Sequence, residues 1–132
     1  IMVEKLGKIL VEISAGELID KITILEIKKS KISNKEKLLE VEKELLILNK
    51  TLKENITGFS QISYLRDRLK EINLTLWDIE NGKRKAEKEN NFNEEFVKLA
   101  RNVYKFNDER AKIKLEINNK LGSNIKEVKS FN

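Results

Sequence analysis

The sequence predicts an all-α protein, either an antiparallel bundle or an elongated helical hairpin of about four helices, with a short strand pair formed by the two termini. Two observations favour this fold. Apolar residues recur every three or four positions over several long stretches, as they do along one face of an α-helix. The connections between these stretches are short, so consecutive helices are expected to run antiparallel. The chain is short enough to form a single domain, residues 1–132.

The first predicted helix covers residues 14–32. Ser14 followed by Glu17 is a capping box, in which the two side chains bond backbone N–H groups at the start of a helix. The apolar side chains fall on two sides of this helix: Leu18, Ile19, Ile22 and Leu25 on one, Ile24 and Ile27 on the other. A helix with this pattern is expected to be covered by neighbours on both sides.

Glu26 lies among the apolar residues of the main face of this helix. A buried carboxylate without a partner is costly or stays protonated. The sequence therefore predicts a cation or several hydrogen-bond donors opposite Glu26. Asp20 and Lys21 are expected to pair locally with helix neighbours such as Glu17 and are weak candidates for a site.

A short strand is predicted before the first helix, because apolar residues alternate over residues 8–13. A single strand needs a partner. The best candidate is the tail at residues 124–131, which follows a turn at Gly122 and Ser123. If the two segments pair, they clamp one end of the helices.

The second predicted helix opens with a capping box of Ser33 and Glu36, and Gly58 ends it as the residue that follows the last turn. Its apolar side chains keep the alternating spacing of three and four that is typical of a helix–helix seam: Leu38, Val41, Leu45, Leu48 and Leu52.

The third predicted helix starts after Ser60 and runs to about Asn90. Its seam continues the same spacing through Ile62, Leu65, Leu69, Ile72, Leu76 and Ile79. Gly82 lies in a polar part of the helix and predicts a bend or break there. Trp77, beside the seam, is expected to serve packing.

The fourth predicted helix begins after Asn93 and ends at Leu121, with Gly122 following the last turn. Four polar residues share its apolar face at positions i, i+3, i+7 and i+11: Asn107, Arg110, Lys114 and Asn118. We call these four residues the polar ladder. Arg110 and Lys114 are the expected cations for Glu26, and Glu80 is a second candidate carboxylate.

Two interpretations of the polar ladder are open. In the first, which we favour, it is a structural polar core that fixes the register or oligomeric state of the helices. In the second, Arg110 and Lys114 hold the carboxylate or phosphate of a small ligand. Glu26, Glu80, Asn107 and Asn118 would complete such a site.

The charge balance is basic, with 27 Lys and Arg against 22 Asp and Glu and a net charge of +5. The densest basic cluster is Lys83, Arg84 and Lys85. Such a cluster is most often a solvated helix face, although it permits nonspecific binding to nucleic acid. Little aromatic interleaving accompanies it, so nucleic acid is not the expected partner.

The chain contains no Cys and no His. Disulfides, the usual zinc and haem sites, and Ser–His–Asp or Cys–His catalysis are therefore excluded. We expect no metal and no cofactor, and the prediction leans away from an enzyme. No signal-peptide pattern and no membrane-spanning apolar run is visible, so a cytoplasmic protein without membrane contact is expected.

Five sequence blocks resemble an uncharacterised bacterial and phage family, a domain of unknown function. The blocks are GELIDKITILEIK at residues 16–28, LWDIE at 76–80, FVKLARNVY at 96–104, NDERA at 107–111 and EVKS at 127–130. Ala15 replaces a proline and Phe131 a tyrosine of that pattern. The resemblance covers nearly the whole chain and implies no established activity.

The leading functional hypothesis is a non-enzymatic assembly or protein-interaction module that forms a homo-oligomer. It follows from the two-sided first helix and the two apolar seams, which offer more apolar surface than four helices are expected to bury alone. The alternatives are a small-anion-binding protein or enzyme that uses the polar ladder, and a nonspecific nucleic-acid-binding protein.

Overall fold

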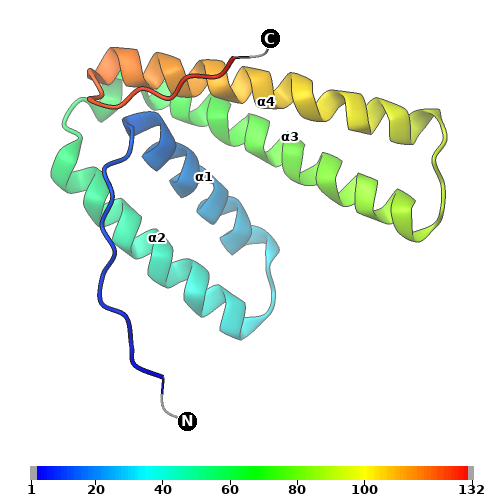
Figure 1. The fold of residues 1–132 in the computed structure, drawn as a ribbon, viewed down its shortest axis with the longest axis horizontal. Helices are drawn as coiled ribbons and strands as arrows, with labels where there is room; N and C mark the ends of the chain where they lie inside the picture. Colours follow the sequence, from blue (N-terminus) through cyan, green and yellow to red (C-terminus); the bar gives the residue numbers. More distant parts are fainter. Residues whose placement is uncertain (1–2, 131–132) are drawn as a thin grey trace.

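The computed structural model describes residues 3–130 and confirms the all-α prediction (Figure 1). This part of the chain contains four α-helices and one short 3-10 helix: α1 (Ala15–Lys31), α2 (Lys35–Asn55), η1 (Phe59–Gln61), α3 (Ser63–Lys88) and α4 (Glu94–Leu121). None of the described helices is long and apolar enough to cross a membrane.

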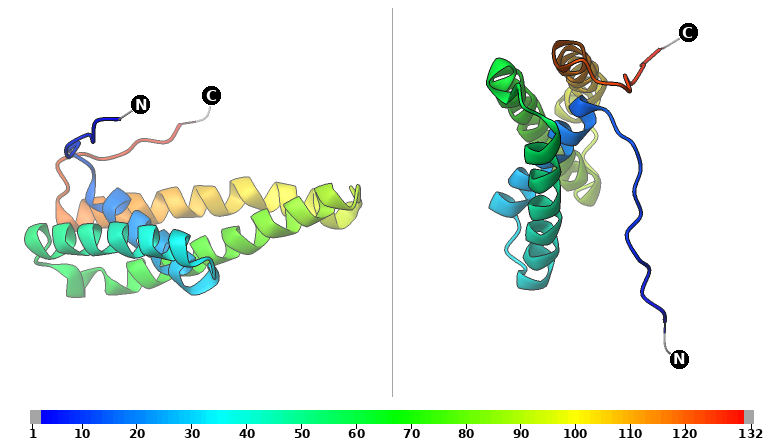
Figure 2. Two further views of the ribbon diagram at one scale, coloured as in Figure 1. Left: turned by 90° about the horizontal axis from the view of Figure 1, so that it is seen from below. Right: turned by 90° about the vertical axis from the view of Figure 1, so that its left-hand side faces the viewer.

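The helices form two antiparallel hairpins of unequal length. The long α3–α4 hairpin extends well past the short α1–α2 hairpin, which packs at an angle against one end of it (Figures 1 and 2). Helix α1 lies in the middle, in contact with α2, α3 and α4. The far half of the α3–α4 hairpin is therefore covered by neither α1 nor α2.

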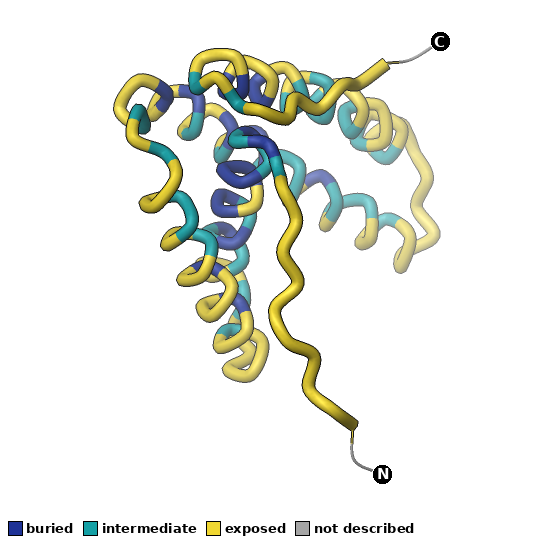
Figure 3. Tube along the Cα trace, turned by 60° about the vertical axis from the view of Figure 1, so that its left-hand side comes forward, coloured by how far each residue is buried: buried dark blue, intermediate teal, exposed yellow. Residues whose placement is uncertain are grey.

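Helix α1 is covered on two sides, as its apolar pattern predicts, and a separate core lies on each side. Toward α3 and α4, Ile19 packs in a cluster with residues such as Leu69 and Ile117. Toward α2, Leu18 packs in a second cluster with residues such as Val41. Burial of each such side chain is worth about 1.5–3 kcal/mol. The dark blue segment of α1 in Figure 3 marks this central position.

Capping residues explain where most helices begin and end. Ser14 Oγ accepts a hydrogen bond from Glu17 N at 3.1 Å, which confirms the predicted start of α1. Asn93 accepts from Phe96 N at 3.2 Å, and Gly122 follows α4 with a left-handed φ of 65°. Both predicted ends of α4 are thus confirmed, since the left-handed conformation favours glycine.

Helix α2 and the start of α3 differ from prediction. Asn34, one residue after Ser33, caps α2 by accepting from Lys37 N at 3.0 Å. Helix α2 ends at Asn55, before Gly58. Gly58 instead precedes η1, which leads into α3 at Ser63, so Ser60 lies within η1 and caps no α-helix.

Helix α3 ends at Lys88, near the predicted end, but it is continuous through Gly82. The predicted break there is wrong. A Cβ at position 82 would lie 3.0 Å from Leu99 Cδ1 of α4, so the glycine permits close packing of the two long helices. Side-chain packing, rather than backbone flexibility, explains this glycine.

The predicted strand pair is also wrong for the described residues, which contain no strand. The segments at 3–13 and 124–130 leave the helices in different directions (Figure 1). They are linked by a side-chain hydrogen bond of 2.6 Å from Asn124 Nδ2 to Glu12 Oε2. Two isolated strands are only marginally stable. The C-terminal segment instead forms two ion pairs with α4, one between Glu127 and Lys114 and one between Lys129 and Asp108. Phe131 of the predicted second strand lies outside the described residues.

Candidate functional site

The centre of the molecule holds a buried ion pair between α1 and α4. The carboxylate of Asp20 on α1 is almost wholly buried. Arg110 of the polar ladder donates from Nε to Asp20 Oδ1 at 3.0 Å and from Nη2 to Asp20 Oδ2. Two parallel charge-assisted hydrogen bonds of this kind fix both the position and the orientation of the two groups.

Two further polar side chains complete the surroundings of Asp20. Asn73 of α3 donates from Nδ2 to Asp20 Oδ1 at 2.8 Å and to Thr23 Oγ1 at 3.0 Å. The Thr23 hydroxyl donates in turn to the backbone carbonyl of Asp20 at 2.8 Å. The network therefore joins α1, α3 and α4. Because its buried groups are hydrogen-bonded, it can stabilise one arrangement of the three helices.

Lys114, one helical turn further along α4, is held by carboxylates from two segments. Its Nζ lies 2.6 Å from Glu17 Oε2 of α1 and 2.9 Å from Glu127 Oε2 of the C-terminal segment. Asp20 Oδ2 is 4.0 Å away. The lysine thus ties the C-terminal segment to the start of α1.

Asn118 lies at a close crossing of α1 and α4. Its Oδ1 accepts from the backbone N of Gly16 at 2.6 Å. A Cβ on Gly16 would lie 2.5 Å from the backbone oxygen of Lys114, so the crossing requires glycine. Beside it, Ser123 Oγ accepts from Ala15 N at 3.0 Å. Asn118 of the polar ladder and Ser123 just after α4 therefore supply acceptors for two backbone N–H groups at the start of α1.

The ion pairs raise the pKa of both ladder cations. The hydrogen bonds to Asp20 raise the pKa of Arg110 and outweigh the opposing effect of burial. For Lys114, burial is the largest single effect and lowers the pKa, but the hydrogen bonds to Glu17 and Glu127, with the charge of Asp20, together raise it. Both groups are therefore held in their charged forms.

Glu26 does not pair with the polar ladder, and this prediction is corrected. Arg66 of α3 donates from Nη2 to Glu26 Oε2 at 2.6 Å, and Lys70 Nζ lies 3.3 Å from Glu26 Oε1. Glu26 faces the start of α3, whereas the ladder faces another side of α1. The carboxylates that pair with Arg110 and Lys114 are Asp20, Glu17 and Glu127. Asp20 falls between Ile24 and Thr23 around the helix, so the second apolar side of α1 was the signal that pointed to it.

An open cleft of about 400 Å³ lies beside the Asp20 network, between α1, α3 and α4. Its lining combines predicted site residues with others that sequence analysis assigned to packing or left out: Ile24, Ile27, Asn73, Leu76, Trp77, Glu80, Asn81, Arg84, Asn107 and Arg110. We call this the interhelix cleft. The structure thus brings Glu80, Asn107 and Arg110 together, while Glu26 and Lys114 do not line it.

The three residues of the basic cluster have different surroundings in the structure. Lys83 lies 3.4 Å from Glu80, with which it forms an ion pair. Arg84 lines the interhelix cleft, and Lys85 is exposed elsewhere on α3. Binding of nucleic acid by these residues stays an untested alternative, and the expectation that nucleic acid is not the partner stays a prediction. No cluster of three or more acidic side chains suited to a metal ion occurs within residues 3–130.

The fold and its network define an all-α protein in which buried ion pairs join two helical hairpins. The chain belongs to a family of unknown function, DUF6165, which matches residues 9–132. No curated protein and no solved structure matches the chain. The predicted membership of an uncharacterised family is therefore confirmed.

Proposed function

We propose that this protein is a non-enzymatic assembly module, in which two copies of the chain associate through apolar surface that one copy leaves exposed. The observation that carries this proposal is the N-terminal segment, residues 3–13. Its large apolar side chains are almost fully exposed, with 89% exposure for Val3 and 86% for Leu10. The segment extends away from the helices, as both views of Figure 2 show.

The outer face of α2 offers a second apolar surface. The seam side chains of α2, among them Val41 and Leu45, are buried against α1. Leu39, Leu46 and Ile47 lie outside this seam, with 73% exposure for Leu46. Leu39 and Leu46 are seven residues apart and therefore lie on one side of α2. Exposed apolar side chains that share a helix face support a protein–protein interface there.

The arrangement of charges supports a structural role for the polar ladder. Arg110 pairs with Asp20, and Lys114 pairs with Glu17 and Glu127, so both cations already have carboxylate partners within the chain. Buried polar groups of this kind can fix the register of packed helices. The module would then present the outer face of α2 and the N-terminal segment in a fixed geometry.

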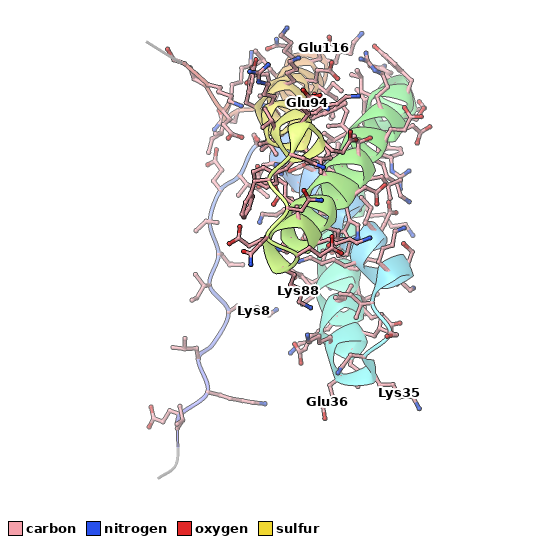
Figure 4. The ribbon with its side chains drawn as sticks, turned by 90° about the vertical axis from the view of Figure 1, so that its right-hand side faces the viewer. Lys8, Lys35, Glu36, Lys88, Glu94 and Glu116 are labelled. Carbon is pink, nitrogen blue, oxygen red and sulfur yellow. The ribbon has the colours of Figure 1, made fainter. Side chains whose placement is uncertain are left out.

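A second copy of the chain is the partner that fits best. One chain carries both an extended apolar segment and an unpartnered helix face, so two copies can cover each other's surfaces without another protein. Repulsion between copies is small, because the net charge is only +5 and charges of both signs surround the helices. Figure 4 shows charged side chains of both signs on the helices, including Lys35, Glu36, Lys88, Glu94 and Glu116. We also propose that this module is cytoplasmic and, from the resemblance of the sequence blocks quoted above, that it is a bacterial or phage protein.

The test is the mass of the particle in solution, measured by sedimentation velocity from about 1 to 100 µM, a range that brackets interfaces of micromolar affinity. We expect a dimer or larger species for the wild type. Leu46→Lys and Leu10→Ser should each shift the equilibrium toward monomer, because they remove apolar surface from the two proposed contacts. Tyr104→Lys, at an exposed position of α4, is the matched control and should leave the equilibrium unchanged.

Two results would overturn the proposal. A wild-type monomer over the whole concentration range removes self-association. If Leu46→Lys and Tyr104→Lys change the monomer–dimer equilibrium equally, the outer face of α2 is not the interface. Circular dichroism of every variant shows whether the helices remain folded.

A further inference from the structure

The interhelix cleft contains an arginine that takes no part in the ion-pair networks. Arg84 is exposed at the rim of the cleft on α3, and it forms no ion pair with any residue in the described part of the chain. Its neighbour Lys83, by contrast, is paired with Glu80. Arg84 is therefore available to a ligand that enters the cleft.

Arg110 presents a second guanidinium to the same cleft. Its Nε and Nη2 are taken by Asp20, whereas Nη1 makes a long contact of 3.5 Å with Asn107 Oδ1. A guanidinium has five N–H donors, so Arg110 retains donors beyond those that hold Asp20. The buried ion pair fixes the orientation of these remaining donors. Such a preorganised donor group reduces the cost of binding an anion.

The rest of the lining suits an organic ligand rather than a bare ion. The amide of Asn81 can both donate and accept hydrogen bonds, and Asn107, whose Nδ2 already donates to the backbone carbonyl of Val103, retains a second N–H donor. The Glu80 carboxylate, 47% exposed, can accept from a hydroxyl or ammonium group. Trp77, with Ile24 and Leu76, gives the cleft an apolar wall. A few polar groups arranged around an apolar wall are typical of small-molecule sites.

We propose that the interhelix cleft binds a small organic anion. Arg84 and Arg110 hold its carboxylate or phosphate, and Glu80 accepts from a hydroxyl or amino group on the same molecule. The cleft of about 400 Å³ admits a compound of roughly the size of a sugar phosphate or a hydroxy acid. This site goes beyond the proposed assembly and does not depend on it, since neither the N-terminal segment nor the outer face of α2 lines the cleft.

Trp77 provides a direct readout, because it is the only tryptophan in the chain and it lines the cleft. We would titrate the full chain with glucose 6-phosphate, glycerol 3-phosphate, citrate and inorganic phosphate at constant ionic strength, and record the tryptophan fluorescence. Glucose and glycerol are the uncharged comparisons. We expect a saturable change with at least one organic anion and none with the two uncharged compounds. The phosphates and citrate distinguish a phosphate from a carboxylate ligand.

The variant that tests the site is Arg84→Gln, and Arg68→Gln is its matched control. Arg68 is also exposed on α3, and its replacement by Gln removes the same charge, but Arg68 does not line the interhelix cleft. Loss of a hydrogen-bonded charged partner should raise the Kd for the organic anion at least about tenfold in Arg84→Gln. Arg68→Gln should bind like the wild type.

Three results would overturn the proposal. They are the absence of a saturable signal for all the anions, equal weakening by Arg84→Gln and Arg68→Gln, and binding of inorganic phosphate as tight as that of every organic anion. The first result leaves a dimer in sedimentation velocity unaffected, so failure of this site and failure of the proposed assembly are distinguishable. Because Arg84 is outside the buried networks, its variant should fold like the wild type.

Discussion

At the scale of single residues, Asp20 is the group on which the structure depends most. Replacement by Asn keeps the shape of the side chain but removes the charge opposite Arg110. Breaking a buried ion pair costs about 3–5 kcal/mol. Because the Arg110 side chain is 28% exposed, we expect Asp20→Asn to lower the free energy of unfolding by less, about 2–4 kcal/mol. Urea unfolding followed by circular dichroism measures this change.

Asp108→Asn is the matched control for Asp20→Asn. Asp108 pairs with Lys129 at 3.0 Å but is 43% exposed, and exposed ion pairs are worth about 1 kcal/mol or less. If the two variants lose equal stability, the Asp20 network does not hold the helices together.

Lys114 predicts a dependence of stability on pH. Its pKa is raised in the folded state, so the folded protein holds this proton more tightly than the unfolded chain. The stabilisation is complete below the ordinary lysine pKa of about 10.4 and is lost as the pH rises through the raised value. In urea unfolding at several pH values, the stability difference between wild type and Lys114→Gln should be constant from about pH 7 to about pH 10 and shrink above it. A difference that grows with pH would contradict this assignment.

Residue patterns in the sequence identified the polar ladder but not its partners. Spacing along one helix places Asn107, Arg110, Lys114 and Asn118 on one face, because helical geometry is local. Which carboxylate meets Arg110 depends on how α1 is rotated and shifted against α4. Both Glu26 and Asp20 of α1 are candidate partners for Arg110. The packing of the two cores orients α1 so that Asp20, and not Glu26, meets Arg110.

At the scale of helices, the crossing of α1 and α4 depends on Gly16. A methyl group at position 16 would lie 2.5 Å from the backbone carbonyl oxygen of Lys114. This oxygen is part of the α4 backbone, so relief of the clash requires the whole helix to shift. We expect Gly16→Ala to lower the free energy of unfolding by about 1–3 kcal/mol, although alanine favours helices in general. Thermal and urea unfolding both measure this loss.

Gly7→Ala is the control for the Gly16 prediction, because a Cβ at position 7 would meet nothing within 4 Å. It should change stability by less than about 0.5 kcal/mol. A Gly16→Ala variant as stable as the wild type would show that the helices can separate at the crossing without cost.

Helix boundaries could be predicted where the signal is a side-chain cap. Ser14 and Asn93 bond to the backbone three residues ahead, and both starts follow from the sequence. Ser60 wrongly predicted the start of α3, because η1 precedes that helix. Gly82 wrongly predicted a break, because its role is to allow close contact with Leu99 of α4. The strand prediction failed for a related reason: alternation along residues 8–13 says nothing about whether a partner strand exists.

At the scale of the whole molecule, the sequence predicted antiparallel helices but could not choose between a bundle and an extended hairpin. Both use the same apolar seams. The choice depends on lengths: α1 and α2 have 17 and 21 residues, whereas α3 and α4 have 26 and 28. The short pair can therefore cover only part of the long pair, and the structure combines the two predicted architectures.

This unequal cover predicts unequal local stability along the long hairpin. The buried residues of α3 end at Ile79 and those of α4 begin at Ile113, so the segment between them has no fully buried side chain among the described residues. Regions with few buried contacts open more readily than the core. In native-state hydrogen exchange, amides within 84–101 should exchange at least about tenfold faster than those at 65–79 and 110–118, which is a difference of about 1.4 kcal/mol in opening free energy. Equal protection at both ends would mean that the α3–α4 contacts alone stabilise the hairpin, and that α1 does not anchor it. The Asp20→Asn variant extends the test, because loss of the network should speed exchange at 65–79 and 110–118 while leaving 84–101 nearly unchanged.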